Sequence, residues 1–431
     1  MRRAITGCLA GLAMLGAHAL AQDSADASRY LDARAALADL QRIVAPGGVQ
    51  DAYKTPIGGI DQWINVRGQD RANPMILFVH GGPASPITPT MWQFQRPIEE
   101  YFTLANYDQR GAGKTYGETD PQLVAPTIHI PRYVDDLIEV AEHLRARYGK
   151  RKLILMAHSW GTIPSMAAAL KRPDLFYAYV GIGQVINVRE NERLGFEYAL
   201  EQARRHDNSE ALHDLQSIAP YPGQGPITRE RIVLARKWPQ HYGGLSAFRS
   251  ESTYFFKGPL LSPDYDARQV AAIDAGSVLT LGRLLPEFVK VDYTHVKAFP
   301  LPVVMFLGRH DYTTPTAPVE AWLKQLKAPS KQAVWFEHSA HMAPWEEPGK
   351  TLVSLLRYVR PLAEPAPPSS RSVLPRSAVR DGKCAGRRRN RGAPAPKTAV
   401  AACRQAHREN GPRPATGYLA APAWPWDAGS T

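Results

Sequence analysis

The chain has 431 residues, an apolar fraction of 44% and a net charge of +12. This length suits one large domain with an insertion, and the composition favours a globular core over a disordered or fibrous chain. The charge does not indicate nucleic-acid binding by the whole chain. Residues 362–431 hold twelve Lys or Arg and four Asp or Glu, so this segment accounts for +8 of the net charge of +12.

The first 21 residues have the features of a signal peptide. Arg2 and Arg3 precede the apolar stretch Ala4–Leu20, and Ala19-Leu20-Ala21 is an A-x-A cleavage site. The apolar stretch is short and rich in small residues, which disfavours a membrane span. We therefore expect export to a periplasm or the exterior, with no membrane span after cleavage. The cysteine positions are those of an exported protein that does not depend on disulfides. All three lie outside the expected core, at Cys8, Cys384 and Cys403, so none can form a disulfide within it.

The expected core, residues 22–183, begins with an amphipathic helical pattern over residues 28–44. Ile57–Val66 follows as a plausible early strand. Pro74–Val79 is a buried strand that runs into His80-Gly81-Gly82-Pro83-Ala84. Glycines directly after a strand leave backbone N–H groups free to face a developing negative charge. Gly82 is therefore a candidate for one half of an oxyanion hole.

A second strand, Phe102–Tyr107, leads into the glycine-rich loop Asp108–Thr115. The loop lacks the G-x-x-x-x-G-K spacing of a phosphate-binding loop. We expect Asp108 and Arg110 to brace a loop at the carboxyl edge of the sheet. Tyr133–Tyr148 then has helical spacing, which gives the alternation of strands and helices typical of a parallel α/β sheet.

The run Leu153–Leu170 indicates a buried strand, a turn through small residues and a helix. Ser159 lies at that sharp turn, the position that projects a nucleophilic hydroxyl out of the sheet. Gly161 provides one of the small neighbours that the turn needs, and Ala157 stands where glycine is usual. The backbone N–H of Trp160 is the candidate second half of the oxyanion hole. The alternative is that Ser159 only caps the helix.

After a strand at Tyr177–Gly183 the pattern changes. Residues 184–299 combine helical stretches, proline breaks and many aromatic side chains, which predicts an inserted helical cap. The core resumes over residues 300–361, where Leu301–Gly308 is a strand followed by Asp311. Ala333–Phe336 is the next strand and leads to His341. The segments Pro315–Leu326 and Lys350–Val359 have helical patterns.

The order Ser159, Asp311, His341 is that of a hydrolase triad. A serine hydroxyl is a weak nucleophile, so a histidine must take its proton and later return it to the leaving group. The aspartate holds the imidazole tautomer and stabilises the imidazolium. Four other groups are weaker candidates for the base or the acid: His338, His310, His158 and Asp108.

The motifs H-G-G-P at His80, D-Q-R-G-A-G at Asp108 and H-S-W-G at His158 together resemble the proline iminopeptidase branch of the α/β-hydrolase superfamily. Members usually read H-G-G-P-G, D-Q-R-G-x-G and G-x-S-W-G, so the chain departs at Ala84 and Ala157. The resemblance covers roughly residues 53–359. It implies an α/β-hydrolase fold, with a mostly parallel sheet flanked by helices and an inserted helical cap.

In that branch, acidic cap residues bind the free amine of the substrate, and Glu190 and Glu192 are the candidates here. The plain alternative is that both are solvated charges on a helix face. The expected activity is that of a serine aminopeptidase acting through an acyl-enzyme on small peptides. A carboxylesterase or amidase on small substrates and a silent ligand-binding protein are the alternatives. The mechanism requires no metal and no organic cofactor.

The last segment, residues 362–431, is a basic Pro/Ala/Arg-rich tail with no apolar period, which predicts disorder. Arg387–Arg391 could attract nucleic acid or an anionic surface. A solvated tail is favoured, so no nucleic-acid partner is expected. The abrupt change of composition is also what a shifted reading frame would produce. The sequence leaves the oligomeric state open.

Overall fold

The computed structural model describes residues 31–363. The predicted signal peptide and almost all of the basic tail lie outside these residues, and both stay predictions. Residues 31–41 are helical, and the last helix, α14 (Arg360–Ala363), extends two residues into the segment that we assigned to the tail. No helix among residues 31–363 is both long enough and apolar enough to cross a membrane.

An eight-stranded sheet forms the centre of the molecule, with strand order β1-β2-β4-β3-β5-β6-β7-β8. β2 runs antiparallel to β1 and β4, and all other neighbouring pairs are parallel. This confirms the predicted α/β fold with a mostly parallel sheet. The strands are β1 (Val49–Ile57), β2 (Ile60–Gly68), β3 (Met75–Val79), β4 (Thr103–Tyr107), β5 (Leu153–His158), β6 (Phe176–Ile182), β7 (Val303–Gly308) and β8 (Lys331–Phe336).

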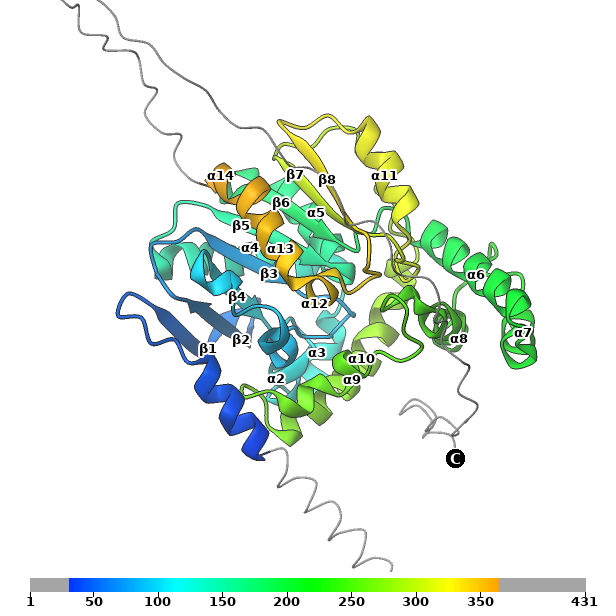
Figure 1. Cartoon of the computed structure of the whole chain (residues 1–431), viewed down its shortest axis with the longest axis horizontal. Coiled ribbons are helices and arrows are strands. Elements are labelled where there is room, and N and C mark those ends of the chain that lie inside the picture. Colours follow the sequence, from blue (N-terminus) through cyan, green and yellow to red (C-terminus); the bar gives the residue numbers. More distant parts are fainter. Residues whose placement is uncertain (1–30, 364–431) are drawn as a thin grey trace, which may run out of the picture. The chain divides into compact units, whose positions relative to one another are not determined.

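Helices cover both faces of the sheet, as parallel strands require (Figure 1). Strand β3 contributes side chains to the cores on both faces of the sheet. Every residue in it is buried, and successive side chains point to opposite sides. Leu77 packs into the core beneath α4 (Ile130–Tyr148), α5 (Thr162–Lys171) and α11 (Thr316–Gln325). Phe78 packs into the opposite core, which includes residues of η1 (Thr88–Gln93), α12 (Ala343–Glu346) and η8 (Leu355–Val359).

The remaining short helices are η1 (Thr88–Gln93), η2 (Ile98–Glu100), α2 (Gly113–Gly117), α3 (Pro121–Val124), η3 (Ala125–Thr127), η4 (Ser159–Gly161), η5 (Pro173–Leu175), α12 (Ala343–Glu346), α13 (Pro348–Ser354) and η8 (Leu355–Val359).

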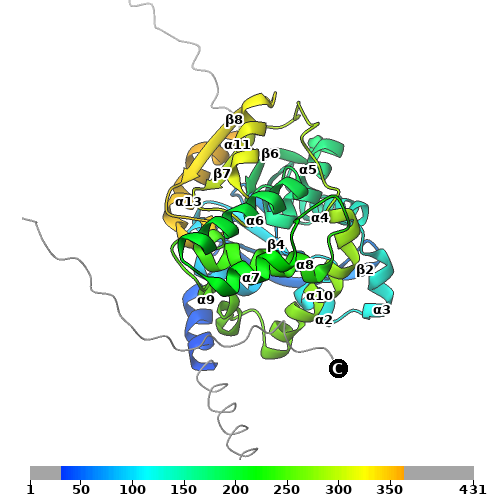
Figure 2. The same ribbon diagram turned by 90° about the vertical axis from the view of Figure 1, so that its right-hand side faces the viewer.

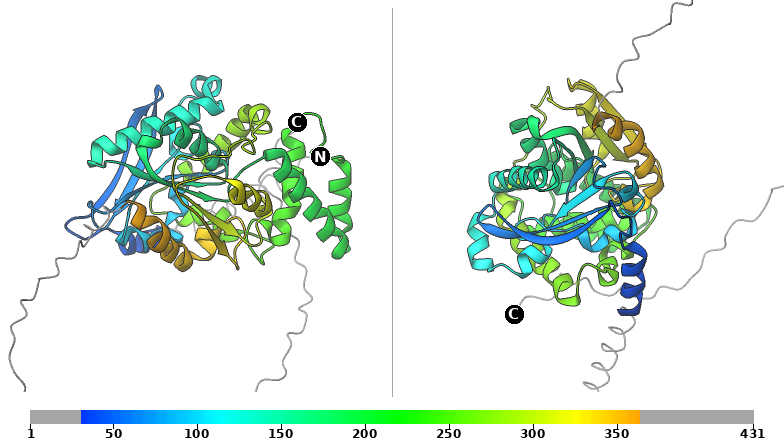
Figure 3. Two further views of the ribbon diagram at one scale, coloured as in Figure 1. Left: turned by 90° about the horizontal axis from the view of Figure 1, so that it is seen from above. Right: turned by 90° about the vertical axis from the view of Figure 1, so that its left-hand side faces the viewer.

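β1 was absent from the elements that we predicted. It forms a hairpin with β2 through Gly58 and Gly59, and Ile57 pairs with Ile60 on either side of this two-residue turn. The φ angles of the two glycines are 59° and 80°. Such a turn needs the left-handed region at both positions, which glycine adopts without steric cost. The right-hand view of Figure 3 shows this blue hairpin at the edge of the sheet.

Between β6 and β7 the chain forms a helical insertion that covers the carboxyl edge of the sheet. Its elements are α6 (Val188–Arg205), α7 (Ser209–Ser217), α8 (Arg229–Pro239), η6 (Gln240–Gly244), α9 (Thr253–Phe256), η7 (Gly258–Leu261) and α10 (Ala267–Phe288). Figure 2 shows α6, α7 and α8 in front of the sheet. A third apolar core joins α6, α8 and α10 to Trp160, the residue after the candidate nucleophile, and to Ile163. The insertion therefore lies over the turn that carries Ser159.

Candidate active site

Four loops at one edge of the sheet carry the predicted catalytic and oxyanion residues. Gly82 follows β3, Ser159 follows β5, Asp311 follows β7 and His341 follows β8. The carboxyl ends of parallel strands meet at the same edge, which is where open α/β sheets bind their ligands. The topology thus brings together residues that are up to 259 positions apart in the sequence.

The turn at Ser159 has the geometry of a nucleophile elbow. Ser159 has φ 54°, a left-handed conformation that is uncommon for a residue with a side chain. At Gly161 a Cβ would lie 2.4 Å from the Val79 carbonyl oxygen, so only glycine allows this approach to β3. Ala157 is fully buried in β5, where its methyl group is accommodated.

Asp311 and His341 form a buried pair. His341 Nδ1 donates to Asp311 Oδ2 at 2.9 Å. The other carboxylate oxygen, Oδ1, accepts from the backbone N–H of Thr313 at 2.9 Å and of Thr314 at 2.8 Å. The Thr314 hydroxyl donates to Oδ2 at 3.0 Å and lies 3.1 Å from His341 Nδ1. These contacts fix the carboxylate and place the proton of the neutral imidazole on Nδ1, which leaves Nε2 available as a base.

The described contacts include no hydrogen bond between the Ser159 hydroxyl and the His341 ring. Such bonds are often long in ligand-free enzymes and shorten in the substrate complex. The ring is held from two other sides. A Cβ on Gly183 would lie 2.6 Å from His341 Cε1, and the His158 ring centre is 4.6 Å from that of His341. Burial, and then the neighbouring His341, lower the pKa of His158 well below its usual value.

A hydrogen-bonded chain joins two of the three motifs to the nucleophile turn. The backbone N–H of Gln109 donates to His80 Nε2 at 3.1 Å, and the Gln109 amide donates to the His80 carbonyl at 2.8 Å. The Trp160 indole donates to Gln109 Oε1 at 3.1 Å. Burial lowers the pKa of His80 to about 4, so its ring is neutral and its Nδ1 donates to Gly81. Gln109 therefore fixes the glycine turn relative to the residue that follows Ser159.

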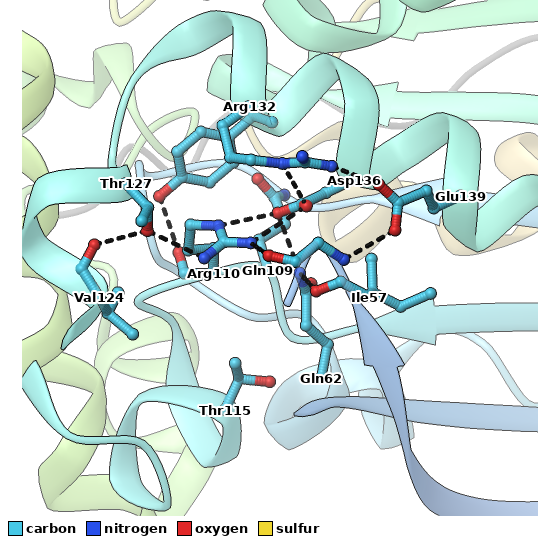
Figure 4. A network of polar contacts seen from close by, with 12 residues as sticks. Ile57, Gln62, Gln109, Arg110, Thr115, Val124, Thr127, Arg132, Asp136 and Glu139 are labelled. Atoms are coloured by element: carbon cyan, nitrogen blue, oxygen red, sulfur yellow. Dashed lines mark hydrogen bonds and ion pairs between the residues drawn. The ribbon is translucent and has the colours of Figure 1, made fainter. Parts of the chain in front are cut away.

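The glycine-rich loop is braced by Asp108 and Arg110, as predicted, and Figure 4 shows the contacts of Arg110. Arg110 makes a buried ion pair with Asp136 of α4, at 3.0 Å from Nε to Oδ2. It also donates to the Gly58 carbonyl at 2.7 Å and to Thr127 at 2.9 Å. Asp108 accepts from the hydroxyl of Tyr265, in the insertion, and burial raises the pKa of Asp108 to about 6.

A pocket lies against Ser159 beneath the insertion. Its cavity volume is about 10 Å³, close to the space that one water needs. Glu192 of α6 lines the pocket, and its carboxylate is paired with Arg236 of α8, at 3.0 Å from Nε to Oε1. The second oxygen accepts from the Tyr221 hydroxyl. The other lining residues are Gly82, Trp160, Val185, Val188, Asn191, Phe288, Thr313 and Thr314.

The structure does not bring Glu190 to this pocket. Glu190 points to the other side of α6, where it pairs with Arg193 at 2.6 Å on the surface. Of the weaker triad candidates, His338 is exposed and His310 packs against Phe248. Three residues that the sequence reasoning missed contribute to the site: Gln109, Arg236 and Thr314. Only Gln109 belongs to a motif that could have drawn attention to it.

Residues 31–363 hold no cluster of three or more His, Cys, Asp or Glu side chains arranged to bind a metal ion. The mostly parallel sheet, the serine elbow after β5 and the Asp–His pair after β7 and β8 define the class of α/β hydrolases.

Comparison with known proteins identifies the family. The model of the alpha/beta hydrolase family matches residues 76–355, so the chain belongs to this family. It is 30% identical over 313 residues to a probable aminopeptidase, YbaC, of Bacillus subtilis (strain 168), a match that covers 70% of this chain and 94% of the relative. It is 21% identical over 320 residues to a proline iminopeptidase of Saccharolobus solfataricus, covering 72% and 92% of the two chains.

Solved structures agree on the fold. The crystal structure of a proline iminopeptidase of Mycobacterium smegmatis matches 73% of this chain with a TM-score of 0.51 and 16% identity, and 99% of that protein is covered. The structure of VinJ matches 72% of this chain with a TM-score of 0.52 and 17% identity, and again 99% of that protein is covered. At these identities the likeness shows the shared fold alone.

Proposed function

We propose that this hydrolase is a serine aminopeptidase that releases N-terminal residues from small peptides. The observation that carries the proposal is the convergence of Ser159 and the buried Asp311–His341 pair beside a pocket that contains the carboxylate of Glu192. The similarity to a probable aminopeptidase and to a proline iminopeptidase supports it.

In the proposed reaction His341 Nε2 takes the proton of Ser159 as the oxygen attacks the scissile carbonyl. The backbone N–H groups of Gly82 and Trp160 would stabilise the oxyanion. The imidazolium, stabilised by Asp311, then protonates the leaving amine, and the C–N bond breaks to give an acyl-enzyme. Water, deprotonated by His341, hydrolyses the ester and restores the serine.

Glu192 is the group that would recognise the substrate's free amine. Its side chain is buried at 3% exposure, so a charge brought to it would be poorly screened by solvent. The neighbouring Asn191 supports this role, because its Oδ1 is buried, has no hydrogen-bond partner among the described residues and belongs to the same pocket. A carboxylate and an amide oxygen are both acceptors that an ammonium group requires.

A carboxylesterase or amidase on small substrates is the second candidate, and one observation favours it. Both oxygens of Glu192 already have partners, Arg236 and Tyr221. An ammonium group would have to share the carboxylate with the Arg236 guanidinium, whereas a neutral acyl group would meet no such competition.

The nucleophile is tested with a fluorophosphonate probe on the folded, full-length chain. We expect one covalent adduct on Ser159, located by mass spectrometry, and none in Ser159→Ala. Labelling elsewhere, or no labelling of folded protein, contradicts the proposed mechanism.

The substrate class is tested by comparing a prolyl amide with a simple acyl ester. We expect turnover of the amide, with a KM that rises about tenfold in Glu192→Gln because an ion pair to the amine is lost. The matched control is Glu190→Gln on the same helix, which should leave KM unchanged. Turnover of the ester alone would refute the peptidase assignment and favour the esterase.

A further inference from the structure

A second and larger cavity lies away from the pocket at Ser159. Its volume is about 720 Å³, within the usual range of small-molecule sites. It is bounded by η1, α9, η7 and α12, and it shares no lining residue with the pocket beneath the insertion. The activity proposed above uses none of the residues that line it.

Three of the ten residues that line this cavity are aromatic. Trp92, Tyr254 and Trp345 line it, and Trp345 is 9% exposed. The indole N–H groups of both tryptophans are buried and have no acceptor among residues 31–363. Because neither N–H has accessible surface, neither faces the cavity, and the tryptophans offer it no hydrogen-bond donor.

The charges around the cavity favour an anion. Arg249 and Lys257 line it with Glu346, and the described residues give the Lys257 ammonium no ion pair. Glu346 is already satisfied within the protein. It accepts from the backbone N–H of Ala247 at 2.7 Å and of Ala340 at 2.8 Å, and it pairs with Arg249 at 2.8 Å. The lining therefore has a positive excess, with one cation free to meet a ligand.

We propose that this cavity is a second ligand site, which takes an organic anion with an aromatic or acyl body. The aromatic side chains would hold the apolar body, and the Lys257 ammonium would meet the acceptor oxygens of a carboxylate or sulfonate head.

The site is separated from the proposed chemistry by a stack of rings. Trp345 packs against His158 with ring centres 5.5 Å apart, and His158 packs against His341 at 4.6 Å. The anion would therefore bind on the far side of this stack, and its binding does not depend on Ser159 or on Glu192.

The test uses 8-anilinonaphthalene-1-sulfonate, an aromatic anion whose emission rises in apolar sites, titrated into the full-length chain. N-phenyl-1-naphthylamine, the same body without the sulfonate, is the neutral reference. We expect saturable binding of the anion at one site. Lys257→Gln should raise its Kd about three- to tenfold and leave the neutral probe unchanged, as expected for one partly exposed charge. Lys324→Gln on α11, an exposed lysine remote from the cavity, is the matched control.

A second variant tests the cavity by its shape. Thr253→Trp, at the exposed start of α9, should narrow the cavity and weaken binding of both probes at least about tenfold. Thr294→Trp, an exposed threonine outside the cavity, should not. Anion binding that survives both Lys257→Gln and Thr253→Trp would place the probe elsewhere and overturn the proposal.

Discussion

Ala84 adopts a left-handed backbone, with φ 63°, in the turn where the related motif has glycine. This conformation costs a residue with a side chain about 1–2 kcal/mol. Glycine adopts this conformation without that cost. It also gives the unfolded chain more conformational entropy, which lowers the free energy of unfolding by about 0.4–1 kcal/mol. We therefore expect Ala84→Gly to raise the free energy of unfolding by about 0.5–1 kcal/mol, as measured by urea denaturation.

The control for Ala84 is Ala321, an exposed residue in the regular helix α11. Ala321→Gly should lower the free energy of unfolding by about 1 kcal/mol, because helical φ angles favour alanine. If both substitutions destabilise the protein equally, the left-handed strain at Ala84 is not released by glycine.

Thr314 is a positioning residue for the proposed triad. Its hydroxyl donates to the Asp311 oxygen that also accepts from His341. Thr314→Val keeps the shape and removes the hydroxyl, so we expect kcat on an acyl ester to fall about tenfold with KM nearly unchanged. Thr314→Ser retains the donor and should keep most of the activity. Equal losses in the two variants would point to packing rather than to the hydrogen bond.

The sequence alone could identify the residues of the site that belong to motifs, but not their partners from the insertion. Ser159, Asp311 and His341 follow strands in the expected order, so their meeting at one edge was predictable. The distinction between Glu190 and Glu192 was also within reach, because the apolar stripe of α6 through Val188, Gly195 and Ala199 passes Glu192. The pairing of Glu192 with Arg236 was not, since it depends on how two separate helices pack.

At the scale of elements, the Arg110–Asp136 pair joins three parts of the core: the loop after β4, helix α4 and the turn between β1 and β2 (Figure 4). Both side chains are almost fully buried, at 0% and 2% exposure. Removing one partner of such a pair leaves the other charge buried without compensation. We therefore expect Asp136→Asn to lower the free energy of unfolding by about 3 kcal/mol.

The adjacent Asp135 provides a matched control on the same helix. It pairs with Lys171 at 2.7 Å, but both side chains are exposed. Exposed pairs contribute little, so Asp135→Asn should change the free energy of unfolding by less than about 1 kcal/mol. Urea denaturation of both variants checks the contrast, and similar losses would argue against a special role of the buried network.

Elements with a strong apolar period could be predicted from the sequence, and those that depend on pairing could not. β1 has buried residues only at its two ends, and the residues between them are exposed or half-buried. Its strand character comes from the ladder with β2, so the sequence pattern gave little indication of it. Helix α10 lies in the predicted helical cap but was not predicted as a separate element, although Asp266 and Gln269 form a capping box at its start.

At the scale of the whole molecule, the insertion is fastened to the loops that carry the proposed triad. The Gly244 carbonyl accepts from the N–H groups of Tyr312 and Thr313, and the Leu245 carbonyl accepts from that of His341. Tyr265 binds Asp108 on the opposite side of the site. The pocket at Ser159 has room for about one water, so we expect side chains or helices of the insertion to move when a substrate enters.

Two buried groups give the stability of the molecule opposite responses to acid. Burial lowers the pKa of His80 from 6.5 to about 4. Between these two pH values the histidine is protonated in the unfolded chain but neutral in the folded chain. Stability is therefore lost as the pH falls from about 6.5 towards 4. Burial raises the pKa of Asp108 from 3.8 to about 6, so the folded chain takes up a proton first. Stability is regained as the pH falls through 6 towards 4.

The two contributions can be separated by measuring the free energy of unfolding at pH 7 and pH 5. As the pH falls from 7 to 5, we expect His80 to lower the free energy of unfolding by about 2 kcal/mol and Asp108 to raise it by about 1 kcal/mol. His80→Asn should therefore make the protein less sensitive to acid than the wild type, whereas Asp108→Asn should make it more sensitive. A response of His80→Asn parallel to that of the wild type would mean that this ring is protonated as readily in the folded chain as in water.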